Sequence, residues 1–99
     1  MKIIKIGQKD YPVKFTFGNI KRTKLKTESE LQSGDITIML DHLTKLFQCG
    51  LNGLGQYSET EVENIIQEYI DNDGDLTDLI MELSEEYAKA LGLKKVQLP

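Results

Sequence analysis

The sequence predicts an α+β fold in which an N-terminal β-hairpin packs on a bundle of three to four helices. Two observations lead to this class. Apolar side chains alternate with polar ones near the N-terminus, as in a half-buried strand, whereas later segments repeat apolar side chains with the period of a helix. The length of 99 residues, with 39% hydrophobic and 28% charged side chains, is typical of one globular domain. We therefore expect a single domain over residues 1–99.

We divide this domain into four consecutive parts. Residues 1–17 are expected to form the hairpin, and residues 18–34 are irregular or contain a short helix. Residues 35–92 form the helical part, which Gly92 closes. Residues 93–99 form a tail whose apolar side chains follow no period.

Each strand of the hairpin is predicted from its own pattern. Alternating apolar and polar side chains predict a strand over residues 11–17, and an apolar run predicts its partner over residues 2–6. Residues 7–10 supply the glycine and the aspartate that suit a short turn. Pro12 has no backbone N–H, so we expect it to face outward on an edge of the hairpin.

The first long helix is predicted from one apolar stripe. Its members recur every three or four residues and are Ile36, Met39, Leu40, Leu43, Leu46 and Phe47. Ser33 or Asp35 is placed to cap the start of this helix, and Gly50 is expected to be the left-handed residue after its end. A glycine-containing loop over residues 51–57 then leads to the next helix.

Two further helices follow this loop. Ser58 and Glu61 have the spacing of a capping box, which marks the start of the second helix. Gly74 is expected to end that helix, and Asp75 or Thr77 to begin the third. The apolar stripes of the two helices are Val62, Ile65, Ile66, Tyr69 and Ile70, and then Leu76, Leu79, Ile80, Leu83, Tyr87 and Leu91.

The hydrophobic core is expected where the apolar faces of these elements meet. Each member of the predicted core lies on the periodic face of its strand or helix. The members are Val13, Phe15, Phe17, Leu43, Phe47, Ile66, Ile70, Leu79, Ile80 and Leu83.

No constellation in the sequence predicts catalysis, a cofactor or a metal site. His42 and Cys49 could act as base and nucleophile, but seven residues of helix separate them by roughly 10 Å. With Gly74 at the glycine position of a calcium loop, Tyr69 and Ile80 would stand at ligand positions, and neither can ligate calcium. Gly53 and Gly55, in the loop over residues 51–57, occur without the third glycine and the lysine that a phosphate-binding loop has. We therefore expect a protein that is not an enzyme.

Charge is distributed unevenly along the chain. Residues 1–26 hold eight basic side chains and one acidic one, a balance of +7, whereas residues 27–99 hold four basic and fifteen acidic ones, a balance of −11. Residues 58–88 contain eleven acids and no base. This asymmetry either leaves a polarised solvated surface or favours weak self-association or a charged partner.

The basic N-terminal segment also permits a nucleic-acid-binding interpretation, which we consider the weaker one. Tyr11, Phe15 and Phe17 could stack on bases. However, these aromatic residues alternate on the face that must supply the core, and the acidic remainder of the chain would repel phosphate. We therefore expect no nucleic-acid partner.

Cysteine usage and hydropathy indicate a cytoplasmic location. Cys49 is the single cysteine, and such a free thiol favours a reducing compartment. No apolar run approaches the ~20 residues that span a bilayer. A lysine interrupts the first apolar stretch, which is not typical of a signal peptide. We expect neither a membrane-spanning segment nor a membrane partner.

Each of these parts contains a short sequence pattern. The hairpin has Tyr11-x-Val13-Lys14-Phe15-x-Phe17-Gly18, and the first long helix ends with Leu46-Phe47-x-x-Gly50-Leu51. The second helix has the acidic and apolar run from Ser58 to Ile70, the turn after it has Gly74-Asp75-Leu76, and the last helix has Leu79, Leu83 and Ala90. Together they resemble the tail assembly chaperones of long-tailed phages and prophages of Gram-positive bacteria. The resemblance covers essentially the whole chain and is strongest over residues 40–91. Residues 21–33 depart from it, because the family usually has a more regular helix there.

The resemblance implies a non-enzymatic role during virion assembly. Such chaperones bind the tape-measure protein, keep it soluble and recruit tail-tube subunits in the host cytoplasm, and they are absent from the mature virion. Two alternatives are a small protein-interaction or nucleic-acid-binding module of a mobile element, and an accessory subunit of an enzyme. The residues assigned to a protein interface are Phe47, Leu51, Leu54, Lys21, Arg22, Lys24 and Leu93.

Overall fold

The computed structural model describes residues 1–23 and 36–92 of the chain. Within these two ranges an antiparallel hairpin precedes four helices, which confirms the predicted α+β class. The predicted helix cap at Ser33 or Asp35 and the tail over residues 93–99 lie outside them. The elements are β1 (Lys2–Ile6), β2 (Lys9–Val13), α1 (Phe17–Thr23), α3 (Ile36–Leu51), α4 (Glu59–Asp71) and α5 (Leu76–Ala90).

The hairpin has one apolar face that belongs to the core. Ile6 lies opposite Lys9, so a two-residue turn connects the strands. Successive side chains of a strand point to opposite faces, and the buried face carries Ile4, Ile6 and Val13. Pro12 lies on the other face, opposite Ile3.

β2 ends at Val13, earlier than predicted, because β1 has no residue left to pair with it. Val13 pairs with Lys2, which is the first residue of β1. The next backbone N–H, that of Lys14, donates instead to the carbonyl of Gly50 at 2.9 Å. Phe17 consequently begins α1 rather than ending a strand, and its side chain is 72% exposed.

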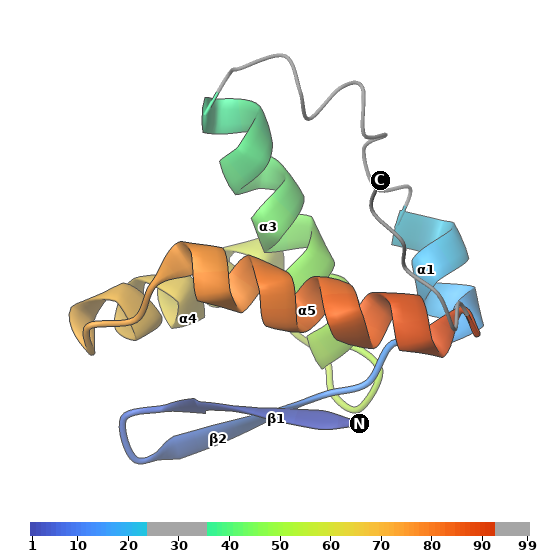
Figure 1. Cartoon of the computed structure of the whole chain (residues 1–99), viewed down its shortest axis with the longest axis horizontal. Helices are drawn as coiled ribbons and strands as arrows, with labels where there is room; N and C mark the ends of the chain where they lie inside the picture. The colour runs from blue at the N-terminus through green and yellow to red at the C-terminus, as the bar shows by residue number, and fades with distance from the viewer. Residues whose placement is uncertain (24–35, 93–99) are drawn as a thin grey trace.

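α3 is the central element of the fold, because β2, α1, α4 and α5 all pack against it. Figure 1 shows α4 and α5 crossing the C-terminal half of α3, with the hairpin beneath them and α1 beside the end of α5. The first turns of α3 project beyond the layer that α4 and α5 form. The elements of the described ranges therefore cover mainly the C-terminal half of the helix.

The predicted core is largely confirmed. Six of its ten members are buried, and Ile66 and Ile80 are partly buried against them. Phe17 and Ile70 were placed in the core wrongly. Ile70 is 41% exposed because the buried face of α4 is centred on Val62 and Ile65, which leaves Ile70 on its flank. The buried cluster is Ile4, Ile6, Val13, Phe15, Leu43, Leu46, Phe47, Cys49, Leu51, Val62, Ile65, Leu79 and Leu83.

Gly50 does not have the role that was predicted for it. It lies inside α3 and not after its end, and it has no left-handed conformation. A Cβ at this position would overlap the side chain of Val13 and lie 3.0 Å from the ring of Phe15. A Cβ on Gly53 would overlap the carbonyl oxygen of Lys14. The absence of side chains at both glycines thus lets the hairpin approach the end of α3.

The predicted starts of α4 and α5 are confirmed. The N–H of Glu61 donates to the hydroxyl of Ser58 at 3.1 Å, and the N–H of Ser58 donates to the Glu61 carboxylate at 3.0 Å, which completes the capping box. The N–H of Thr77 donates to the Asp75 carboxylate at 2.8 Å. Asp75 is therefore the N-cap of α5.

The connection between α4 and α5 is a tight turn that requires glycine for space. The left-handed residue of this turn is Asp73, with a φ of 64°. A Cβ on Gly74 would lie 2.5 Å from ring carbons of Tyr69. The hydroxyl of Tyr69 donates to the carbonyl of Asp75 at 3.0 Å, so the ring is held across the turn. Residues 72–75 thus form a tight turn between α4 and α5.

A pair of phenylalanine variants tests this account of the core. Phe47→Ala removes a side chain that is 0% exposed, and such truncations cost about 3–5 kcal/mol of unfolding free energy. Phe17→Ala removes a side chain that is mostly in solvent, so the expected change is within about 0.5 kcal/mol. Chemical denaturation followed by circular dichroism measures both values. Equal losses in the two variants would contradict the assigned core.

Candidate protein-binding surfaces

Two residues assigned to a protein interface lie in the core. Phe47 is 0% exposed and Leu51 is 1% exposed, and both belong to the central hydrophobic cluster. The assignment is therefore wrong for these two side chains. The reason is that they lie on the C-terminal half of α3, which the hairpin and the other helices cover.

The remaining assigned residues come from separate parts of the chain. Leu54, which is 50% exposed, lies in the turn after α3. Lys21 and Arg22 are exposed in the last turn of α1. Lys24 and Leu93 lie outside the described residues. The structure thus does not gather the assigned residues into one patch.

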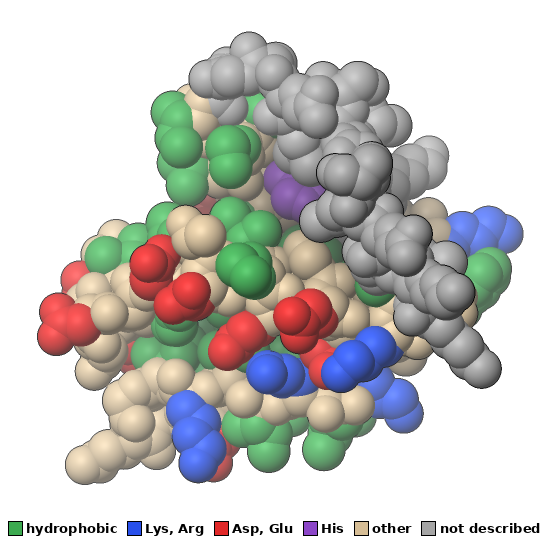
Figure 2. Space-filling view, viewed as in Figure 1, with side chains coloured by type: hydrophobic (Ala, Val, Ile, Leu, Met, Phe, Trp, Pro, Cys, Tyr) green, Lys and Arg blue, Asp and Glu red, His purple; other side chains and the backbone are tan. Residues whose placement is uncertain are grey.

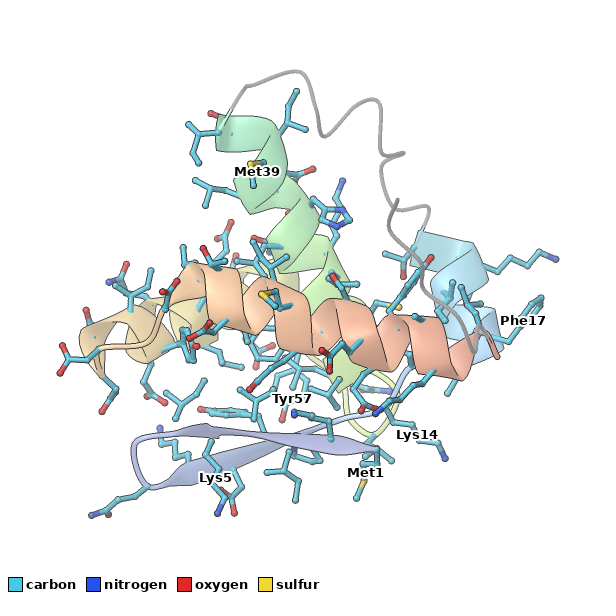
Figure 3. All side chains as sticks on the ribbon, viewed as in Figure 1. Met1, Lys5, Lys14, Phe17, Met39 and Tyr57 are labelled. Carbon is cyan, nitrogen blue, oxygen red and sulfur yellow. The ribbon has the colours of Figure 1, made fainter. Side chains whose placement is uncertain are left out.

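The exposed N-terminal end of α3 is an apolar surface that the sequence did not distinguish from the core. Ile36 is 64% exposed, Met39 41% and Leu40 45%, although all three belong to the stripe that is buried farther along the helix. Figure 3 shows Met39 on the projecting part of α3, away from the hairpin. Spacing alone could not reveal this exposure, because the period of a stripe does not say how far its neighbours extend.

The solvent face of α5 carries acidic side chains around one exposed methionine. Met81 is 57% exposed, and Asp78 and Glu85 lie three residues before it and four after it, on the same side of the helix. Figure 2 shows acidic side chains gathered along α5, on the same face of the molecule as the apolar end of α3. We define the α3–α5 surface by Ile36, Met39, Leu40, Met81, Asp78, Glu82 and Glu85.

Some acidic side chains of α4 and α5 hold the fold together. Glu68 accepts hydrogen bonds from Lys9 at 3.3 Å and from the Tyr11 hydroxyl at 3.2 Å, which joins the hairpin to α4. Burial, and then the negative charge of Glu68, raise the pKa of Tyr11. Glu86 pairs with the N-terminal ammonium at 3.8 Å and with Lys89 at 3.6 Å.

The acids of the α3–α5 surface have no such partners in the described part of the chain. Among residues 1–23 and 36–92, no ion pair involves Asp78, Glu82 or Glu85. Their negative charge is therefore not neutralised by any of these residues. The surface combines exposed apolar side chains with acids that form no ion pair with residues 1–23 or 36–92.

The opposite charge lies near α1. Lys14, Lys21 and Arg22 are exposed, and the exposed Phe17 lies between Lys14 and Lys21 in the sequence. Tyr11 and Phe15 are not available to stack on bases, because Tyr11 is partly buried against α4 and Phe15 is buried. The ring of Phe15 instead meets that of Tyr87 edge to face, with a 5.7 Å separation of the centroids.

An open cleft over the turn between α3 and α4 consists of groups that already have structural roles. Ser58 and Glu61 line it, and both are engaged in the capping box. Asn52 also lines it, and its carboxamide oxygen accepts a hydrogen bond from the N–H of Tyr57 at 2.7 Å. The polar groups of this cleft thus stabilise the turn and the start of α4.

The single thiol of the sequence lies in the hydrophobic core. Cys49 is 3% exposed, and burial raises the pKa of its thiol, with a hydrogen bond to Thr23 acting in the opposite direction. Within the described ranges, no three His, Cys, Asp or Glu side chains are grouped to hold a metal ion. None of the helices in these ranges is long and apolar enough to cross a membrane.

Comparison with known proteins finds no matching family model, no similar curated protein and no similar solved structure.

The burial of Cys49 predicts a thiol that reacts only when the protein unfolds. A raised pKa keeps the thiol protonated at about pH 8, and the surrounding core excludes reagent. Ellman's reagent should therefore label the native protein far more slowly than the denatured protein. Cys49→Ala with Ser84→Cys, which places a thiol on the exposed side of α5, is the matched control and should react at once. Rapid labelling of native Cys49 would contradict its place in the core.

Proposed function

We propose that this protein is a tail assembly chaperone of a long-tailed phage or prophage, which acts by binding other proteins and not by catalysis. It binds the tape-measure protein, keeps that protein soluble and recruits tail-tube subunits. It acts in the cytoplasm of the host cell and is absent from the mature virion. The α3–α5 surface is the observation that carries the protein-binding part of this proposal.

The exposed apolar side chains of α3 support a binding role, because they do not belong to the hydrophobic core. A soluble domain normally scatters its exposed hydrophobic residues singly, and contiguous ones mark interaction sites. Ile36, Met39 and Leu40 lie next to one another on consecutive turns of α3. The acidic residues around Met81 keep such a surface hydrated until a partner covers it.

The assignment to phage tails rests on the resemblance between the sequence and that family. Several residues that carry the resemblance have clear structural positions. Phe47 lies in the core, Gly50 allows the hairpin to approach α3, and Ser58 with Glu61 forms a capping box. These residues specify a fold, and a fold can serve several functions. A direct functional test is therefore required.

Co-expression with a candidate tape-measure protein is that test. The tape-measure protein alone should accumulate in the insoluble fraction, and co-expression of this chain should move a large part of it to the soluble fraction. A soluble complex of the two proteins should elute together in size-exclusion chromatography. The coding region itself supplies the candidate, because a tape-measure gene is expected immediately downstream and a tail-tube gene upstream. An unchanged insoluble fraction, with this chain itself soluble, would refute the proposal.

The opposite charges of the chain also predict weak self-association. Lys21 and Arg22 of one copy can approach the acidic helices of another, and this attraction is screened beyond about 10 Å at 0.1 M salt. Sedimentation velocity should show dissociation as salt rises, and Lys21→Gln with Arg22→Gln should weaken association at low salt. Association that persists or strengthens at high salt would indicate an apolar interface.

A further inference from the structure

The α3–α5 surface has the features of a site for another helix. Its apolar part is formed by side chains of two helices, whose backbone groups already bond within each helix. A strand could not extend a sheet here, because strand addition requires an unpaired edge. A helix satisfies its own backbone hydrogen bonds, so it can bury an apolar face against α3 and α5.

The exposed apolar side chains of the surface come from two helices. Figure 1 shows the first turns of α3 standing above α5, so that the two helices form a corner. Ile36, Met39 and Leu40 are exposed on the first turns of α3, and Met81 is exposed on α5. Two of these four residues are methionines, whose flexible side chains adapt to the surface of a bound helix.

The charge of the surface defines the polar part of that partner. Asp78, Glu82 and Glu85 are not paired in the described part of the chain, and residues 58–88 contain no base. On α3, Lys45 is paired with Asp41 at 3.3 Å. Lysine or arginine side chains that flank the apolar face of a bound helix would meet this negative charge.

We propose that the α3–α5 surface binds an amphipathic helix whose apolar face is flanked by lysine or arginine residues. This inference rests on the proposed function, because the tape-measure protein is the partner expected to supply the helix. An anionic membrane is a poor alternative, since eleven acids over residues 58–88 would be repelled by its headgroups. A second copy of the chain is the remaining alternative, and the variants below distinguish it.

The experiment measures binding of a labelled synthetic peptide to the full chain by fluorescence anisotropy. The probe is an amphipathic helical peptide of leucine and lysine, and its control has the same leucines with glutamate in place of lysine. We expect the lysine peptide to bind at least about tenfold more tightly than the glutamate peptide. Its affinity should fall as salt rises, because charge attraction is screened.

Paired variants of the chain show whether binding occurs at the proposed surface. Met39→Ser with Leu40→Ser, and separately Asp78→Asn with Glu85→Gln, should each weaken binding by about tenfold. The matched controls are Ile3→Ser, which is 46% exposed on the hairpin, and Glu59→Gln with Glu63→Gln on α4. These controls should change affinity by less than about twofold. Circular dichroism verifies that each variant folds.

Three results would overturn the inference. One is equal binding of the two peptides, and another is equal loss of affinity in the surface variants and the controls. The third is self-association that disappears in the Met39→Ser and Leu40→Ser variant, which would make this surface an interface between copies. If the peptide binds as expected but the tape-measure protein stays insoluble, the proposed function fails and the surface stands. If the chain with Met39→Ser and Leu40→Ser still solubilises the tape-measure protein fully, the α3–α5 surface is not the binding site and the proposed function stands.

Discussion

The close approach of the hairpin to the C-terminal end of α3 is the constraint on which the rest of the structure depends. The backbone N–H of Lys14 donates to the carbonyl of Gly50, and Val13 and Phe15 lie on either side of this contact. Any side chain at Gly50 or Gly53 would overlap atoms of this segment. A two-stranded hairpin is only marginally stable by itself. Its apolar face is therefore held by docking against α3.

The hairpin, α1, α4 and α5 all pack on the same helix, α3. Within residues 1–23 and 36–92 they cover the half that ends at Leu51, and the side chains of Ile36, Met39 and Leu40 are exposed. One apolar stripe thus has two roles, since its later members stabilise the fold and its first members face solvent. The acidic face of α5 borders the exposed part. In this way the placement of the core also determines where an apolar surface remains open to a partner.

The sequence predicts the local features of this fold better than its long-range ones. The capping box, the Asp75 cap and most of the core follow from spacing within single elements. The end of β2 and the role of Gly50 depend on a contact between residues far apart in the chain, which no local pattern contains. For the same reason the apolar period does not show that Phe47, which was assigned to the interface, is buried.

The contact between Lys14 and Gly50 also sets an order of events during synthesis. The hairpin is translated before α3, and the surface on which it packs, from α3 to Gly53, is complete only later. Until then the apolar side chains of Ile4 and Ile6 have no core to enter, and exposed strands of this kind are prone to aggregation. A ribosome that stalls before this point would release a chain with an unprotected hairpin. The nascent protein is therefore most prone to aggregation until Gly53 has been added.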